Sequence, residues 1–176
     1  MSGHSKWSQI KHKKGIADQK KGQLFSKLSK VISIAARKGD DPEMNMELKN
    51  AIEKARAANM PKDNIERAIK RVSDKGATQL EELVIETIGP ESLAIIITAI
   101  TDNKNRTMGE VKKILSEFGY KTGSVMWMFT KQGQEFVPQY PIEKLSEETK
   151  SNLEKLFERL DGNEDVQEVY DNLAAN

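Results

Sequence analysis

The spacing of apolar residues predicts helices in the first part of the chain. From Lys21 onward, apolar residues recur at intervals of three and four until Gly39 ends the run. Two further stripes with the same spacing cover residues 42–58 and 63–75. The residues before Lys21 show no clean apolar period and read as a basic arm. Residues 21–76 are therefore expected to form a small three-helix unit.

Two short motifs predict where the second and third helices begin. Asp40-Asp41-Pro42 offers an N-cap followed by proline at the first helical position. Asp63, with Glu66 three residues later, resembles a capping box for the third helix.

After Gly76 the apolar period becomes that of strands. Branched and aromatic residues gather in five short runs, at 80–88, 93–101, 124–130, 135–137 and 166–170. The run 93–101 is almost wholly apolar, which is typical of a central strand covered by helices. Two helices are expected between the runs, one at a capping box of Thr107 and Glu110 and one at Ser146. The order ββαββαβ predicts an α+β sandwich, a mostly antiparallel sheet with helices on one face.

Charge is distributed unevenly between these two parts. The 176 residues carry 28 Lys and Arg against 27 Asp and Glu, a net charge of +1. Residues 1–76 alone have a net charge of +9, residues 77–176 one of −8, and residues 1–38 hold ten basic residues and one acid. We interpret the chain as a basic helical domain with an N-terminal arm at 1–76, which binds a polyanion, joined to an acidic α+β domain at 77–176. An ordinary surface with uneven charge is the alternative.

The composition also disfavours several classes of protein. There is no cysteine, no apolar run long enough to span a membrane, and no apolar segment typical of a secretory signal near the start. These features fit a cytoplasmic protein. His4 and His12 lack neighbouring metal ligands, and no phosphate-binding loop or nucleophile-elbow motif occurs. We therefore expect no metal, no cofactor, no small-molecule substrate and no enzymatic activity.

The basic arm contains the first group of candidate nucleic-acid-binding residues. Lysines attract phosphates, hydroxyl groups bond to phosphate oxygens, and an indole can stack on an unpaired base. The candidates are Ser5, Lys6, Trp7, Lys11, His12, Lys13, Lys14, Lys20 and Lys21. For Trp7 the alternative is that it packs the arm onto the helical unit.

Two predicted helices supply the second group of candidates. At about 100° per residue, the basic residues of the first and third helices fall opposite their apolar stripes. These candidates are Lys27, Lys30 and Arg37 in the first helix and Arg67, Lys70 and Arg71 in the third. A solvated helix face is the alternative, although such faces usually mix both signs of charge. The spacing does not distinguish DNA from RNA, because phosphate contacts carry no sequence information.

A polar loop lies between the apolar strand and the following helix. Its side chains can hold the turn through bonds to the backbone, which explains the loop without a function. The alternative is a partner-contact loop made of Asp102, Asn103, Asn105, Arg106 and Thr107.

Six segments together resemble the YebC/PmpR family. They are GHSKW at 3–7, IKHKK at 10–14, AANMPKDNIERAIKR at 57–71, TDNKNRT at 101–107, GSV at 123–125 and DVQEVYDN at 165–172. The resemblance runs over nearly the whole chain, in the same order. That family comprises bacterial probable transcriptional regulators and a related mitochondrial translational activator.

The resemblance implies a cytoplasmic, non-enzymatic protein that binds nucleic acid. The transcriptional role implies promoter DNA as the partner. The translational role implies ribosomal RNA and the ribosome, where the protein eases synthesis through difficult stretches such as consecutive prolines. Typical members are longer and carry an additional α/β domain before their last helix. Only residues 138–145 separate the corresponding elements here, so we expect this chain to lack that domain.

Overall fold

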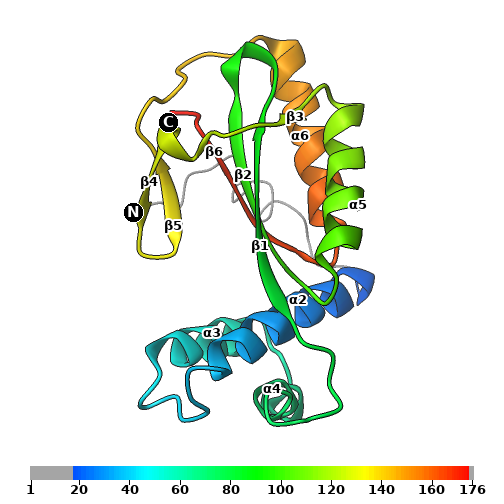
Figure 1. Ribbon diagram of the computed structural model, residues 1–176, viewed down its shortest axis with the longest axis vertical. Coiled ribbons are helices and arrows are strands. Elements are labelled where there is room, and N and C mark those ends of the chain that lie inside the picture. Colours follow the sequence, from blue (N-terminus) through cyan, green and yellow to red (C-terminus); the bar gives the residue numbers. More distant parts are fainter. Residues whose placement is uncertain (1–17, 175–176) are drawn as a thin grey trace. The chain divides into compact units, whose positions relative to one another are not determined.

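The computed structural model describes residues 18–174, which form two compact units (Figure 1). The helical unit consists of residues 18–81 together with the short segment 100–103. The α+β unit consists of residues 82–99 and 104–174. The whole is an α+β fold, as the apolar pattern predicted.

Three helices build the helical unit around a core of small and branched side chains. They are α2 (Asp18–Ala36), α3 (Met46–Ala57) and α4 (Lys62–Lys70). Ile32 of α2, Leu48 and Ile52 of α3, and Ile65 of α4 are buried together. Alanines at the contacts let the helices approach closely, and the Ser33 hydroxyl donates to the Ala68 carbonyl at 2.7 Å. The predicted three-helix unit is confirmed.

The turn between α2 and α3 depends on one buried side chain, Asn45. Its Oδ1 accepts the backbone N–H of Leu48 at 3.1 Å and so caps α3. Its Nδ2 donates to the carbonyls of Ala35 and Gly39, at 2.8 and 2.7 Å, where α2 ends. The start of this helix predicted at Asp40-Asp41-Pro42 is therefore wrong, because Asn45 is the N-cap and α3 begins at Met46.

The chain leaves α3 through a left-handed residue, Asn59, with φ of 60°. The N–H of Met60 then bonds to the Ala55 carbonyl at 3.0 Å, and the Met60 side chain is buried, as in a Schellman motif. Pro61 precedes α4, and no side chain caps that helix. The predicted capping box of Asp63 and Glu66 is wrong, because both residues lie within α4.

A four-stranded sheet forms the centre of the α+β unit, in the order β3-β1-β2-β6. These strands are β1 (Glu81–Ile88), β2 (Ala94–Thr101), β3 (Lys121–Thr122) and β6 (Val166–Asp171). Strand β3 pairs antiparallel with β1, and β6 pairs antiparallel with β2. A separate hairpin consists of β4 (Phe129–Gln132) and β5 (Glu135–Pro138), and the helices are α5 (Lys104–Glu117) and α6 (Glu147–Asp161).

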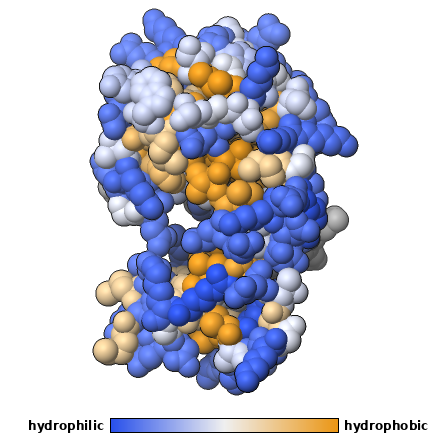
Figure 2. All heavy atoms as spheres, viewed as in Figure 1, coloured by the Kyte–Doolittle hydropathy of each residue, from blue (hydrophilic) through white to orange (hydrophobic). Residues whose placement is uncertain are grey.

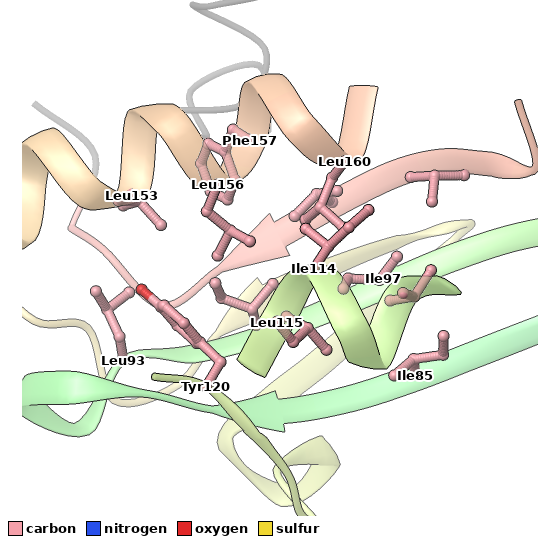
Figure 3. Packing of buried hydrophobic residues seen from close by; sticks show 14 of the residues in the cluster. Ile85, Leu93, Ile97, Ile114, Leu115, Tyr120, Leu153, Leu156, Phe157 and Leu160 are labelled. Carbon is pink, nitrogen blue, oxygen red and sulfur yellow. The ribbon is translucent and has the colours of Figure 1, made fainter. Parts of the chain in front are cut away.

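The central strand β2 is buried on both faces, which explains its uninterrupted apolar sequence. Ile95 and Ile97 face α5 and α6, where they pack with Leu115, Leu156 and other residues (Figure 3). On the other face Ala94 and Ile96 pack beneath the β4–β5 hairpin and the short helical turn η2 (Met126–Met128). The predicted helices on one face are present, and the hairpin covers the opposite face (Figure 1).

The structure corrects three details of the prediction for this unit. Helix α5 begins at Lys104 rather than at a capping box on Thr107, which is buried inside the first turn. Residues 124–128 are not a strand, since 126–128 form η2, and only 129–130 of the predicted strand belong to one, β4. The two-residue strand β3 was not predicted, because it is too short to show a period.

Candidate nucleic-acid interface

Part of the predicted site lies outside the described residues. The arm candidates Ser5, Lys6, Trp7, Lys11, His12, Lys13 and Lys14 all precede residue 18. Their assignment to nucleic acid stays a prediction. The other candidates can be placed.

The basic residues of α2 do not form one exposed face. Lys20 and Lys21 are exposed in its first turns, but Lys27 is only 7% exposed and Lys30 is half-buried. Arg37, just past the helix end, donates to the Leu80 carbonyl and so helps to hold the end of the unit in place. The predicted basic face of α2 is therefore reduced to its N-terminal end, and burial argues against a direct phosphate contact by Lys27.

The candidates of α4 are better placed for binding. Arg67 and Lys70 are exposed in its last turn, and Arg71 follows half-buried at the C-cap. Their spacing of three and four residues brings these three side chains to one side of the helix. Within the described part of the chain, no carboxylate forms an ion pair with any of the three. Their charge is available to an anion.

Two basic residues near α4 were missed by the sequence analysis. Lys54 and Arg56 are exposed in the last turn of α3, and within residues 18–174 neither forms an ion pair. They also favour their own helix, because cations near a helix C-terminus interact well with its dipole. Their position just before the Asn59 turn, which leads directly into α4, is the signal that could have found them. We call Lys54, Arg56, Arg67, Lys70 and Arg71 the α3–α4 basic cluster.

Two cations near the connection between α2 and α3 differ from those of the cluster, because they lie beside carboxylates. Lys38 pairs with Glu47 at 2.6 Å, and Lys49 lies 3.5 Å from Glu43. Asp40 and Asp41 are exposed in the same connection. This connection therefore carries mixed charge, and the cations near it lie beside carboxylates, unlike those of the α3–α4 basic cluster.

The exposed lysines of α2 lie apart from the cluster. Thirteen residues separate Lys20 from Ser33, where α2 touches α4 at Ala68. At 1.5 Å per residue this is about 20 Å along the helix.

Two residues of the polar loop after β2 form hydrogen bonds that hold the loop against the start of β6. Arg106 donates to Asp165 at 2.8 Å, and the Thr107 hydroxyl donates to the same carboxylate oxygen at 2.6 Å. Asp165 is 4% exposed and lies directly before β6. Asp102, Asn103 and Asn105 are exposed. The contacts of Arg106 and Thr107 support the structural explanation for their half of the loop.

Other kinds of site were searched for in residues 18–174. No three His, Cys, Asp or Glu side chains there stand close enough together to hold a metal ion. None of the helices described is both long and apolar enough to cross a membrane.

Comparison with known proteins identifies the family. The family model for the TACO1/YebC protein N-terminal domain matches residues 5–75. The model for the TACO1/YebC second and third domain matches residues 80–139. The chain belongs to the TACO1/YebC family. Its resemblance to that family is thus confirmed.

Several relatives carry the name probable transcriptional regulatory protein. The one from Treponema denticola is 53% identical over 153 residues, covering 84% of this chain and 61% of the relative. The one from Petrotoga mobilis is 44% identical over 174 residues, covering 96% of this chain and 69% of the relative. This chain therefore spans about two thirds of the length of these relatives.

The fold also matches a solved structure. A conserved hypothetical protein from Aquifex aeolicus superimposes with a TM-score of 0.84 at 29% identity, with 97% of each chain covered. In the present structure only residues 139–146 connect β5 to α6, and they contain no helix or strand. This short connection agrees with the expectation that no further domain is inserted there.

Proposed function

We propose that this protein is a transcriptional regulator that binds DNA through its helical unit. The observation that carries the proposal is the α3–α4 basic cluster, five cations on two successive helix ends with no acidic partner among the described residues. The names of the relatives support a regulatory role. The arm lysines, which precede the described residues, add four further positive charges to the same part of the chain.

In this proposal the basic side chains bind the phosphate groups of the nucleic-acid backbone. Arginine can bond two phosphate oxygens at once, whereas lysine acts as a point charge. Arg67 and Lys70 would engage the backbone at one point, and Lys20 and Lys21 at another about 20 Å away. Such contacts fix the position of the protein on its target, and base contacts would have to supply the specificity.

Ribosomal RNA is the second candidate target, with a role in translation at the ribosome. The same cations suit it, because every nucleic acid presents phosphate. One observation favours it specifically. Trp127 and Tyr140 in the α+β unit are 65% and 58% exposed, and duplex DNA has no free base faces on which exposed rings can stack.

Binding measurements on two matched double variants test the proposal. Arg67→Ala/Lys70→Ala removes two unpaired cations, and Lys38→Ala/Lys49→Ala removes two cations that already face carboxylates. The probes are a 30-base-pair DNA duplex and a ribosomal RNA fragment, at 100 mM salt. We expect the first variant to bind at least tenfold more weakly and the second to change less than twofold.

The comparison of probes decides between the two targets. Tighter binding to the duplex supports transcription, whereas tighter binding to the RNA and co-sedimentation with ribosomes supports translation. Equal affinities of both variants and the intact protein would contradict a role for the α3–α4 basic cluster.

A further inference from the structure

Two large aromatic side chains stand exposed next to each other on the α+β unit. Trp127 is 65% exposed and Tyr140 is 58% exposed, and their ring centroids lie 5.9 Å apart with planes tilted by 55°. In Figure 2 apolar residues also reach the surface between the β4–β5 hairpin and β1. Rings of this size are usually buried, so this pair requires an explanation.

The local structure holds Trp127 outward. One carboxylate oxygen of Glu86 accepts the backbone N–H groups of Val125 and Met126, both at 2.7 Å, and so fixes the start of η2. Val125 and Met128 enter the core beneath the hairpin, which leaves Trp127 between them on the solvent side. The indole Nε1 donates to the Ser124 carbonyl at 3.2 Å. The ring is thus held in place before any partner arrives.

Tyr140 is tied to the same turn from the other side. The backbone N–H of Gln139 donates to the Met128 carbonyl at 2.8 Å, and its side chain donates to the Phe129 carbonyl at 3.2 Å. These two bonds extend the hairpin by one residue and bring Tyr140 against Trp127. We call this pair of neighbouring exposed rings, Trp127 and Tyr140, the aromatic corner.

The sequence segment that contains Trp127 differs in charge from its unit taken as a whole. Residues 77–176 have a net charge of −8, yet residues 118–134 contain Lys121 and Lys131 and no acid. The nearest carboxylate at η2 is that of Glu86, which is occupied by two N–H groups. Other neighbours are neutral hydrogen-bonding side chains such as Ser124 and Gln139. The segment that contains Trp127 therefore combines an exposed aromatic ring with two lysines and no acid.

Another exposed apolar pair in the molecule has the opposite surroundings. Met44 and Met46, 88% and 69% exposed, stand among Asp41, Glu43 and Glu47 in the helical unit. Phosphate would be repelled there. The aromatic corner is the exposed apolar pair whose charge suits a nucleic acid.

We propose that Trp127 and Tyr140 form a stacking platform for an unpaired base of single-stranded nucleic acid. Aromatic faces beside lysines and neutral polar groups are the common means by which proteins bind single strands. The inference rests on the nucleic-acid binding in the proposed function, favours its second candidate target, and adds two points. The ligand has unpaired bases, and the α+β unit contributes to binding as well as the helical unit.

Fluorescence and affinity measurements with one reference protein test this proposal. The chain has two tryptophans, so Trp7→Phe leaves Trp127 as the sole reporter and serves as the reference for every comparison. The probes are a single-stranded 20-residue oligouridylate and a 20-base-pair DNA duplex. We expect the single strand to quench Trp127, and the duplex to leave its emission unchanged.

The variants separate stacking from other effects. In the reference background, Trp127→Ala and Tyr140→Ala should each weaken single-strand binding about tenfold and duplex binding less than twofold. Trp127→Phe keeps a ring and should stay within about threefold of the reference. Met44→Ala removes an equally exposed apolar side chain elsewhere and should change nothing.

Each contrary outcome has a distinct meaning. Stacking is overturned if the emission of Trp127 stays unquenched when the protein is saturated with the single strand. It is also overturned if both alanine variants bind like the reference while Arg67→Ala/Lys70→Ala binds both probes more weakly. In either case the proposed function stands. If neither the reference nor the intact protein binds either probe, both fail. If Trp127 becomes shielded from acrylamide as protein concentration rises without any oligonucleotide, the corner is a contact between copies of this chain, and stacking is overturned.

Discussion

At the residue scale, the contact between Gly89 and Tyr120 leaves no room for a side chain. Gly119, with φ of 80°, ends α5 in a Schellman motif, and the N–H of Tyr120 bonds to the Leu115 carbonyl at 3.0 Å. The Tyr120 ring is buried against the turn after β1, and this burial raises the pKa of its hydroxyl to about 12. A Cβ placed on Gly89 would come within 2.2 Å of that ring.

Two glycine-to-alanine variants should therefore have opposite effects. Gly89→Ala forces the buried ring to move, and overpacking of this kind costs about 1–3 kcal/mol of the free energy of unfolding. Gly109→Ala places a methyl group in open space on helix α5, where alanine is favoured over glycine by about 0.5–1 kcal/mol. Thermal unfolding followed by circular dichroism measures both changes. A Gly89→Ala protein as stable as Gly109→Ala would contradict the contact.

Residue positions relative to the core also limit what the sequence can predict about the site. Arg67 and Lys70 were predicted as exposed basic residues, and they are exposed. Lys27 fits the same periodic argument, yet its side chain is buried. Helical periodicity identifies one apolar stripe, but it does not show that a long lysine stem is covered as well.

At the element scale, Glu91 joins the β1–β2 turn to the start of α6. Glu91 and Ser92 are consecutive left-handed residues, with φ of 56° and 62°. This backbone directs the carboxylate to the Ser146 and Thr149 hydroxyls and to the Ser146 N–H. Hydrogen bonds from Ser146 and then Thr149 lower the pKa of Glu91 below its ordinary value of 4.5. A negative charge at this helix end also interacts favourably with the helix dipole.

The stability contributed by Glu91 should depend on pH in a defined direction. Because its folded pKa lies below the unfolded value, the contribution is complete above about pH 4.5 and is lost as pH falls through the folded pKa. Glu91→Gln should lower the melting temperature at pH 7, and the difference from the intact protein should close in acid. Glu148→Gln, in the first turn of α6 but outside these bonds, is the matched control. A constant difference down to pH 2 would argue against the carboxylate.

Elements with a strong period were predicted well, and those decided by distant contacts were not. The apolar run at 93–101 was predicted as a central strand and forms β2, and Ser146 does cap α6. Residues 124–130 alternate like a strand, but residues 126–128 form η2 and the strand begins only at Phe129. The Glu86 carboxylate on β1 accepts the backbone N–H groups of Val125 and Met126, where η2 begins. The start predicted at Asp40 was wrong because the Asn45 side chain caps α3 and also bonds to carbonyls where α2 ends, contacts that the sequence pattern does not show.

At the scale of the whole molecule, the net charge of +1 conceals a separation of charge between the two parts of the chain. Of the cations in the helical unit, those near the acidic connection are paired, and those of the α3–α4 basic cluster are not. The α+β unit is acidic as a whole, but residues 118–134, which include Trp127, contain two lysines and no acid. Acidic surface repels phosphate, so a nucleic acid should be confined to the cluster, the arm and the aromatic corner. Confinement of this kind limits indiscriminate binding along a polyanion.

The dependence of binding on salt tests this confinement quantitatively. Each phosphate neutralised adds about 0.9 to the slope of log affinity against log salt on B-DNA, and about 0.7 on a single strand. Arg67→Ala/Lys70→Ala should therefore lower the slope by about 1.8 on a duplex and about 1.4 on a single strand, whereas Lys38→Ala/Lys49→Ala should leave it unchanged. Trp127→Ala should weaken single-strand binding at every salt concentration without altering the slope, because stacking releases no counterions. Titrations by fluorescence anisotropy between 50 and 300 mM salt measure all three slopes, and an equal fall in the slope for both double variants would show that the paired cations bind phosphate too.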